Sequence, residues 1–251
     1  MIMAPRYIDQ ATLDAREDEI LDQALMIVEH QGLSALTVDK VVTSVSYSKG
    51  TVYNHFSSKE DIYTALCNRN MRDLADLFRR AAAIDTSERH KMAAIGFAYM
   101  LMVLLTPQSF TLMMNAKTEI FEKATPERGE EHERLDCVLF GICNQVIVNA
   151  IEKKELQLKE GVSESDATFS IYAICFGTIG LLLKKDRSCQ STMGGMLEDR
   201  VIAHGNIVMD GLGWLPAPTP TGEFIDYLKT HIFAAEIALL HERGVDLQQG
   251  I

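Results

Sequence analysis

The chain has 251 residues, of which 47% are hydrophobic and 24% carry charge, as in an ordinary soluble globular protein. Its length allows one large domain or two modest ones and is enough to bury a sizeable core. The formal net charge of −11 excludes a general attraction to nucleic acid, so any DNA-binding role requires a local basic surface.

Targeting signals and cysteine usage bear on the compartment. Residues 1–10 contain an arginine but no apolar segment behind it, so we expect no secretory signal. The longest apolar run, residues 169–183, is shorter than the roughly 18–20 residues that a membrane-spanning helix needs. The five cysteines include no CxxC pair, which is typical of free thiols in a reducing cytosol. We therefore expect a cytoplasmic protein without a membrane partner.

Apolar residues recur at helical spacing along almost the whole chain, and runs with the alternating pattern of strands are nearly absent. The sequence therefore predicts an all-α protein. In the first helix Ile20, Ala24, Ile27 and Val28 share one face, and Gly32 is placed to end the helix.

Two very short helices and a longer one follow. The first short helix is expected over residues 37–44 and the second over 48–55, with a tight turn at 46–47. The longer helix is expected over residues 58–83, where a serine at the start and Asp61 three residues later form a capping box.

The remaining sequence predicts longer helices and one linker. Thr86 or Ser87 caps the first of these helices, and Ser163 with Asp166 forms a capping box before another. A linker with three prolines, at residues 215–222, precedes a final amphipathic helix. The expected helices lie at about residues 87–105, from 107 onward, 127–151 with a charged start at 127–134, 167–185, 193–212 and 223–243.

Residues 40–59, KVVTSVSYSKGTVYNHFSSK, carry the pattern that points to a function. The window contains Lys40, Lys49 and Lys59 but no carboxylate, which is an unusual local balance in so acidic a chain. Two short helices joined by a turn, the second of them basic and rich in hydroxyl groups, are what a helix-turn-helix requires. The second helix would enter the major groove of DNA, and flanking groups would hold phosphates.

Spacing assigns roles to the side chains of the second short helix. Val52 and Phe56 lie four residues apart and should pack inward. Thr51 and Asn54 then face outward and suit base edges, whereas basic and aromatic neighbours suit phosphates. A glycine between them lets the backbone approach DNA closely. The predicted DNA-binding residues are Thr37, Lys40, Tyr47, Ser48, Lys49, Gly50, Thr51, Tyr53, Asn54, His55 and Lys59.

The segment SKGTVYNHFSSKEDIYTAL, residues 48–66, resembles the signature of the TetR family of transcriptional regulators. In that signature a Ser-Lys-Gly-Thr-(aliphatic)-Tyr-x-His-Phe run leads into Lys-Glu-Asp-(aliphatic). The upstream match is looser, and the resemblance covers about residues 16–66. Two departures lie before the signature, because residues 45–46 read Val-Ser where the family usually has Ala-Gly, and residues 41–42 read Val-Val where it often has Ile-Ala. Both are sterically tolerable and would alter the angle between the two short helices.

The resemblance implies an N-terminal three-helix DNA-binding domain at residues 1–60, joined by the helix at 58–83 to a larger helical domain at 61–251. The larger domain would bind a ligand and dimerise. The resemblance further implies a homodimer on a pseudo-palindromic double-stranded operator and a repressor released by a small-molecule effector. We expect no catalytic residues, metal or cofactor, because the histidines and cysteines lack ligand spacing and no nucleophile–base pair is evident.

Large, soft apolar groups gather outside this head, at residues 97–105, 110–114 and 138–147. One interpretation is a pocket between helices for an apolar or amphipathic effector, with Asn144 as a polar anchor. The other is a plain helical core in which methionines fill gaps. The candidate ligand-binding residues are Phe78, Phe97, Met100, Leu104, Phe110, Met113, Met114, Phe121, Phe140, Asn144 and Phe176.

The helix at residues 167–185 is apolar almost all round, so it must be covered on several sides. A two-fold interface formed with the helix at 193–212 would bury that surface. The extra C-terminal helix at 223–243 is expected to cover either this seam or the mouth of a pocket.

Other functional classes stay open at this point. The acidic net charge also suits a helical small-molecule-binding protein or enzyme that no longer binds DNA. An activator, or a regulator without a ligand, would carry the same helix-turn-helix head.

Overall fold

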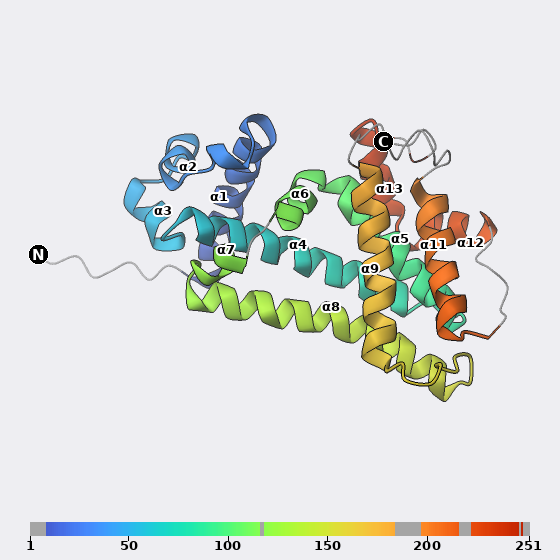
Figure 1. Ribbon diagram of the computed structural model, residues 1–251. Coiled ribbons are helices and arrows are strands. Elements are labelled where there is room, and N and C mark those ends of the chain that lie inside the picture. The colour runs from blue at the N-terminus through green and yellow to red at the C-terminus, as the bar shows by residue number, and fades with distance from the viewer. Residues whose placement is uncertain (1–8, 116–117, 184–196, 216–221, 246, 248–251) are drawn as a thin grey trace, which may run out of the picture. The chain divides into compact units, whose positions relative to one another are not determined.

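The computed structural model describes residues 9–115, 118–183, 197–215, 222–245 and 247. The elements in these ranges are helical, apart from one isolated β-bridge between Leu156 and Trp214, so the predicted all-α fold is confirmed. The elements are α1 (Gln10–Gln31), the 3-10 turn η1 (Leu33–Ala35), α2 (Val38–Ser44), α3 (Lys49–His55), α4 (Lys59–Ala82), α5 (Glu88–Leu105), α6 (Pro107–Asn115), α7 (Thr118–Glu122), α8 (Pro126–Glu152), α9 (Glu164–Leu183), α11 (Leu197–Leu212), α12 (Gly222–Tyr227), the π-helical turn η2 (Leu228–Ile232) and α13 (Ala234–Glu242) (Figure 1).

Side-chain caps explain where several helices begin. The hydroxyl of Thr37 accepts a hydrogen bond from the backbone N–H of Lys40, and Ser48 and Ser87 cap α3 and α5 in the same way. At the end of α1, Gly32 has a φ of 81°, a left-handed conformation that glycine adopts without steric cost. These four predicted boundaries are confirmed.

The two predicted capping boxes differ in detail. The side chains of Ser163 and Asp166 each accept a hydrogen bond from the other residue's backbone N–H at 3.1 Å, as expected. α9 begins at Glu164, three residues earlier than predicted, so Asp166 lies in its first turn. At the start of α4, the Ser58 hydroxyl accepts from the N–H of Asp61, but the Asp61 carboxylate accepts from the N–H of Ser57 rather than from that of Ser58. In the box at the start of α4, the hydrogen bond accepted by the Asp61 carboxylate therefore comes from a residue one position earlier than expected.

The structure divides into two compact units. The head unit comprises residues 1–70 and 108–133, and the body unit comprises residues 71–107 and 134–251. These units differ from the expected division near residue 60, because α6, α7 and the first turns of α8 belong to the head unit. α4 and α8 each have one end in either unit.

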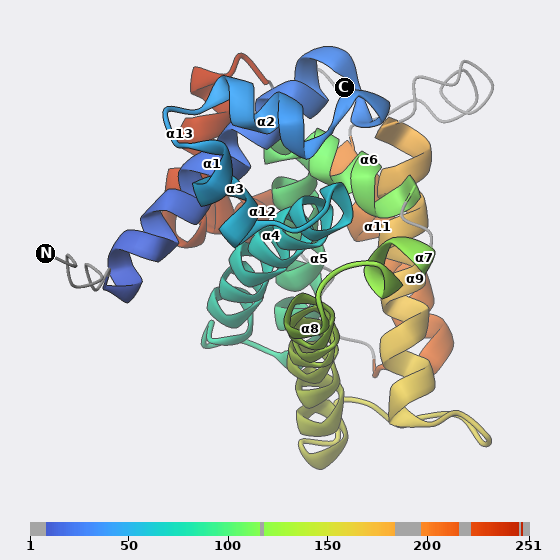
Figure 2. The ribbon, with the colours of Figure 1, turned by 90° about the vertical axis from the view of Figure 1, so that its left-hand side faces the viewer.

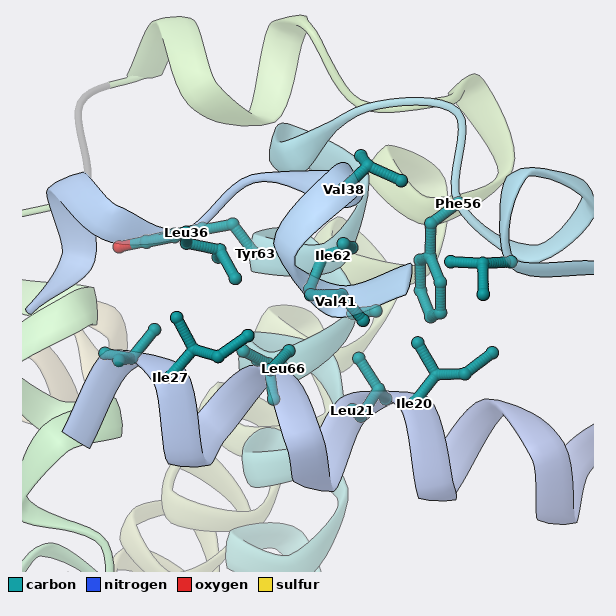
Figure 3. Packing of buried hydrophobic residues seen from close by; sticks show 14 of the residues in the cluster. Ile20, Leu21, Ile27, Leu36, Val38, Val41, Phe56, Ile62, Tyr63 and Leu66 are labelled. Carbon is teal, nitrogen blue, oxygen red and sulfur yellow. The ribbon is translucent and has the colours of Figure 1, made fainter. Parts of the chain in front are cut away.

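The core of the head unit joins α1, α2, α3 and the first half of α4. Figure 3 shows Ile20 and Leu21 of α1 pointing toward Val41 of α2 and toward Phe56, which follows α3. All four side chains are almost completely buried, and Val52 of α3 is fully buried among them. Burying such groups contributes roughly 1.5–3 kcal/mol each, so the apolar face predicted for the three helices holds them together.

The body unit is built around α5, whose side chains are buried almost from end to end. α9, α11 and α13 pack on α5, and α9 and α11 lie side by side (Figure 1 and Figure 2). The chain after residue 222 therefore covers part of α5. The predicted single helix at 223–243 is wrong in one respect, because a π-helical turn at residues 228–232 interrupts it.

Two helices, Pro126–Glu152 and Glu164–Leu182, are long and apolar enough by length and composition to cross a membrane. Only 22% and 39% of their most apolar windows are buried within a single copy of the chain. Core helices of soluble proteins pass the same test, so the length and composition of these two helices are only weak evidence for a membrane span. The expected helix ends at residues 184–185 and 193–196 lie outside the described residues.

Candidate nucleic-acid interface

α2 and α3 are held at a fixed angle by their buried valines. Val38 and Val41 of α2 and Val52 of α3 are buried in the head core, and Val45 in the connecting turn packs against the same cluster. α3 is only seven residues long, and its inward-facing residue Val52 packs into this core. Lys49, Gly50, Tyr53 and Asn54 of α3 are exposed to solvent.

The structure exposes most of the side chains that the sequence predicted to meet DNA. Tyr47 and Thr51 are half-buried, and the ring of His55 is the least accessible, with only 10% of its side chain exposed. The exposed members of the predicted set are Thr37, Lys40, Ser48, Lys49, Gly50, Tyr53, Asn54 and Lys59.

Two of these residues, Lys49 and Tyr53 of α3, share one face with Asp39 of α2. The Nζ of Lys49 donates to Oδ1 of Asp39 at 2.9 Å, and the Tyr53 hydroxyl donates to the same oxygen at 3.3 Å. The Lys49 Nζ also lies 5.3 Å from the centroid of the Tyr53 ring. Sequence reasoning missed Asp39, because it stands one residue before the carboxylate-free window and reaches Lys49 only through the folding of the two helices.

Other predicted residues are held by partners on α1. The Tyr47 hydroxyl donates to a carboxylate oxygen of Glu19, and the Arg16 guanidinium lies over the Tyr47 ring. The Lys40 Nζ donates to the side-chain oxygen of Gln31 at 2.9 Å. α1 therefore orients two of the predicted side chains, Tyr47 and Lys40.

The end of α3 is held from α8. The Arg128 guanidinium donates to the backbone carbonyl of His55 at 3.2 Å and lies over the Phe56 ring at 4.7 Å. It also makes two hydrogen bonds to the carboxylate of Glu17, which is 3.6 Å from Nδ1 of His55. The buried ring and carbonyl of His55 thus take part in positioning α3.

Asp61 ties the start of α4 to the start of α8. Its carboxylate accepts from the N–H and hydroxyl of Ser57 at 2.9 and 2.6 Å, and from the N–H of Thr125 at 2.6 Å. Burial alone would raise the pKa of Asp61, but these hydrogen bonds outweigh it and lower the pKa below its usual value. The carboxylate is therefore charged and holds both helix starts at neutral pH.

The predicted ligand-binding residues are divided between the two units. Phe110, Met113 and Phe121 belong to the head unit, where Phe121 stacks on His132 and contacts Tyr63, while the Met114 side chain lies outside the described part of the chain. The other predicted residues lie in the body unit and comprise Phe78, Phe97, Met100, Leu104, Phe140, Asn144 and Phe176.

Within the body unit, an aromatic series joins two of these residues through two that the sequence did not single out. The Phe78 ring contacts Tyr99, Tyr99 contacts Tyr172, and Tyr172 contacts Phe176, with centroid distances between 5.6 and 6.4 Å. Asn144 accepts a hydrogen bond from the Thr168 hydroxyl, which fits its predicted role as a polar group among apolar neighbours. Phe97 instead packs on Phe233 of the C-terminal segment.

Cysteine and metal chemistry find little support in the described residues. Burial raises the pKa of the Cys67, Cys143 and Cys175 thiols to about 12, so they stay protonated at neutral pH. Among the residues that the structure describes, no group of three or more histidine, cysteine or acidic side chains is arranged to hold a metal ion.

α2 and α3 bury their inward faces in the head core, and α3 exposes a basic outer face. Together they define a helix-turn-helix head. Residues 20–66 match the family model described as bacterial regulatory proteins of the tetR family. Among curated relatives, the activator FasR of Mycolicibacterium smegmatis is 29% identical over 86 residues, or 34% of this chain and 39% of FasR. The repressor AcnR of Corynebacterium diphtheriae is 24% identical over 135 residues, or 51% of this chain and 70% of AcnR.

Solved structures extend the likeness beyond the head. PfmR of Thermus thermophilus has a TM-score of 0.58 and 17% identity, covering 78% of this chain and 99% of PfmR. FadR of Bacillus subtilis, solved with stearoyl-CoA, has a TM-score of 0.61 and 16% identity, covering 77% of this chain and 98% of FadR. Residues 20–66 therefore form a DNA-binding head of the tetR family, and the chain shares the fold of the solved TetR-family regulators.

Proposed function

We propose that this protein is a sequence-specific DNA-binding regulator of transcription, acting as a dimeric repressor that a small apolar or amphipathic effector releases from its operator. The observation that carries this proposal is the exposed outer face of α3, with Lys49, Tyr53 and Asn54, on a head that matches the tetR family model. In a chain with a net charge of −11, such a face is where phosphates can be approached.

The proposed division of labour at the interface follows the chemistry of the side chains. Asn54 and Thr51 read base edges in the major groove, where an asparagine amide matches adenine. Lys49, Tyr53 and Lys59 hold phosphates. Gly50 has no side chain to hold the backbone of α3 away from the DNA, and a Cβ at this position would meet Oγ of Ser48 at 3.9 Å.

The remaining predicted residues divide between contact and support. Thr37, Lys40 and Ser48 are exposed at the ends of α2 and α3 and are proposed to hold the flanking backbone. His55 is proposed to support α3 rather than to contact DNA, because its ring faces Glu17 and is largely buried. Tyr47 is proposed to combine contact with support, because its hydroxyl already donates a hydrogen bond to Glu19.

The proposed dimer uses α9 and α11. Large apolar side chains on these two helices stay exposed in a single copy of the chain, with Phe169 and Ile207 at 62% and 68% exposure. Two helices that present an apolar face side by side can form a four-helix interface with a second copy through a two-fold axis. Such a dimer would present two copies of α3 to a pseudo-palindromic operator.

The proposed effector site lies in the body unit, along the aromatic series that runs from Phe78 to Phe176. Apolar walls with a few polar groups are typical of small-molecule sites, and Asn144 with Thr168 supplies the polar groups here. The solved FadR with stearoyl-CoA supports an acyl-type effector for this chain as well. α4 and α8 each run from the head unit into the body unit and would carry the signal.

Fluorescence anisotropy on DNA from upstream of the protein's own gene tests the proposal. Wild type, Lys49→Ala and Tyr53→Phe are compared at two salt concentrations, with a random duplex of the same length as the control DNA. We expect tight, sequence-preferring binding by wild type that weakens steeply with salt and falls at least several-fold in Lys49→Ala. Equal, weak binding to both duplexes, tested also on selected genomic fragments, would contradict the DNA-reading role.

The effector is tested on the same complex with stearoyl-CoA as the first probe. A ligand shifts an equilibrium only by its differential affinity for the two states, so release of DNA at saturating stearoyl-CoA is the informative readout. Phe78→Ala should change the response to the probe more than the affinity for DNA. Binding of stearoyl-CoA without any change in DNA affinity would contradict its role as the effector.

A further inference from the structure

Asp39 closes a triangle of side chains across the two helices of the head. Its Oδ1 accepts from the Lys49 Nζ at 2.9 Å and from the Tyr53 hydroxyl at 3.3 Å, and the Lys49 Nζ lies over the Tyr53 ring. Asp39 lies in the first turn of α2, whereas the two donors lie on α3. One carboxylate therefore engages both donors on the outer face of α3.

The triangle contributes little to holding the two helices together. The side chains of Asp39 and Lys49 are 69% and 65% exposed, and ion pairs so open to solvent stabilise a fold only slightly. Val41 of α2 and Val52 of α3 are both fully buried in the head core, which already holds the two helices together. The role of Asp39 therefore follows from the roles of its two donors, Lys49 and Tyr53.

Lys49 and Tyr53 are two of the residues proposed to hold the DNA backbone. A carboxylate and a phosphodiester offer an ammonium and a hydroxyl the same kind of anionic oxygen acceptor. The hydrogen bond with Lys49 lowers the pKa of Asp39 below its usual value and raises the pKa of Lys49, so both groups are charged at neutral pH. A DNA phosphate must then compete with Asp39 for these donors.

We propose that Asp39 is an intramolecular competitor of the DNA backbone, whose carboxylate occupies Lys49 and Tyr53 until a phosphate displaces it. This inference rests on the proposed DNA-binding function. The competition involves phosphates and no base edge, so it lowers the affinity for operator and for unrelated DNA by the same factor. It holds the affinity low enough for an effector with a modest differential affinity to release the protein.

The test measures dissociation constants by anisotropy at about 50 mM salt, on the duplex from upstream of the gene and on a random duplex of equal length. Asp39→Asn keeps the shape of the side chain and removes its charge. We expect it to tighten binding to both duplexes by about two- to tenfold, with the ratio between them unchanged. Glu160→Gln makes the same change in net charge at an exposed site in the body unit and should leave binding within twofold.

A second background separates competition from plain repulsion between Asp39 and DNA. In Lys49→Met the principal donor is gone, so Asp39→Asn should add less than about a twofold gain there. Thermal melting checks that wild type, the two single variants at positions 39 and 49 and the double variant fold alike. A gain of equal size in both backgrounds overturns the inference in favour of direct repulsion.

The remaining outcomes distinguish this inference from the function on which it rests. If wild type binds DNA and Asp39→Asn binds no more tightly, the inference alone is overturned. If neither protein binds either duplex at low salt, the proposed function fails and the inference fails with it.

Discussion

Arg128 and Glu17 form a paired hydrogen bond between α8 and α1, with Nη1 and Nη2 of the arginine at 3.0 and 2.9 Å from the two carboxylate oxygens. The same guanidinium bonds the carbonyl of His55 and lies over the Phe56 ring. The first turn of α8 therefore holds the C-terminal end of α3. Because Arg128 belongs to α8, which continues to Glu152, a shift of α8 would be transmitted directly to α3, the proposed recognition helix.

Replacing Arg128 should loosen the recognition helix while leaving the helices formed. Arg128→Ala removes four interactions of a largely buried guanidinium, so we expect the free energy of unfolding to fall by about 2–3 kcal/mol. Arg128→Lys keeps the charge but loses the paired geometry and should cost about half as much. Urea unfolding and hydrogen exchange of the α3 amides measure both effects. Arg134→Lys, at an exposed position on α8, is the matched control, and equal losses in the two lysine variants would argue against the clamp.

The charge on Asp61 should make the head unit sensitive to acid. Its folded pKa is lowered, so its contribution is fully present above the unfolded value of about 3.9 and is lost as pH falls through the folded value. Asp61→Asn cannot accept the hydrogen bonds from Ser57 and Thr125 with two oxygens, and we expect a loss of about 2–3 kcal/mol at pH 7. Urea unfolding at pH 7, 5 and 3.5 should show the difference from wild type shrinking only at the lowest pH. A difference that stays constant down to pH 3.5 would point to lost packing instead.

The C-terminal segment is anchored to the last turn of α4 by a single arginine. Arg80 makes two hydrogen bonds to Glu236 at 2.6 and 3.0 Å, bonds the carbonyl of Ile232, and lies over the Phe233 ring at 5.2 Å. Burial would raise the pKa of Glu236, but the hydrogen bonds from Arg80 lower it overall. This pairing keeps the carboxylate charged.

Glu236→Gln leaves the Arg80 guanidinium partly buried without its counter-charge. We expect the free energy of unfolding to fall by about 1–3 kcal/mol, and limited proteolysis to cut the segment after residue 222 sooner than in wild type. Glu242→Gln, an exposed acid at the end of the same helix, should behave as wild type in both measurements. Unchanged proteolysis in Glu236→Gln would mean that apolar packing alone holds the segment.

The exposed apolar face of α9 and α11 predicts a dimer that charge can break. Phe169→Asp and Ile207→Asp change solvent-facing residues, so each should leave a single copy folded while placing a carboxylate in the proposed interface. We expect size-exclusion chromatography with light scattering to shift from the mass of two chains to that of one. Leu239→Asp alters an exposed leucine on α13 and should not shift the mass. A wild type that runs as a single chain, or a dimer that survives both changes, would contradict this interface.

Local chemistry was enough to predict much of the head. Thr37, Ser48 and Gly32 set helix boundaries through interactions with the backbone within a few residues, so their effect is visible in the sequence. The inward face of Val52 and Phe56 follows from helical spacing alone. The exposure of Lys49, Tyr53 and Asn54 has the same origin, since a seven-residue helix with one buried face must expose the other.

Contacts between residues far apart in the chain were decided only by the tertiary structure. Sequence spacing could not bring Asp39 to Lys49, Arg128 to the end of α3, or Tyr99 between Phe78 and Tyr172, because each contact depends on how separate helices pack. The π-helical turn before Phe233 likewise arises where the C-terminal segment meets Arg80 and α5. Most helices, several of their caps and the basic character of the outer face of α3 could be predicted from the sequence, because these are local properties. Which charges neutralise one another on that face, and which helices hold it in place, depended on three-dimensional packing that no short segment encodes.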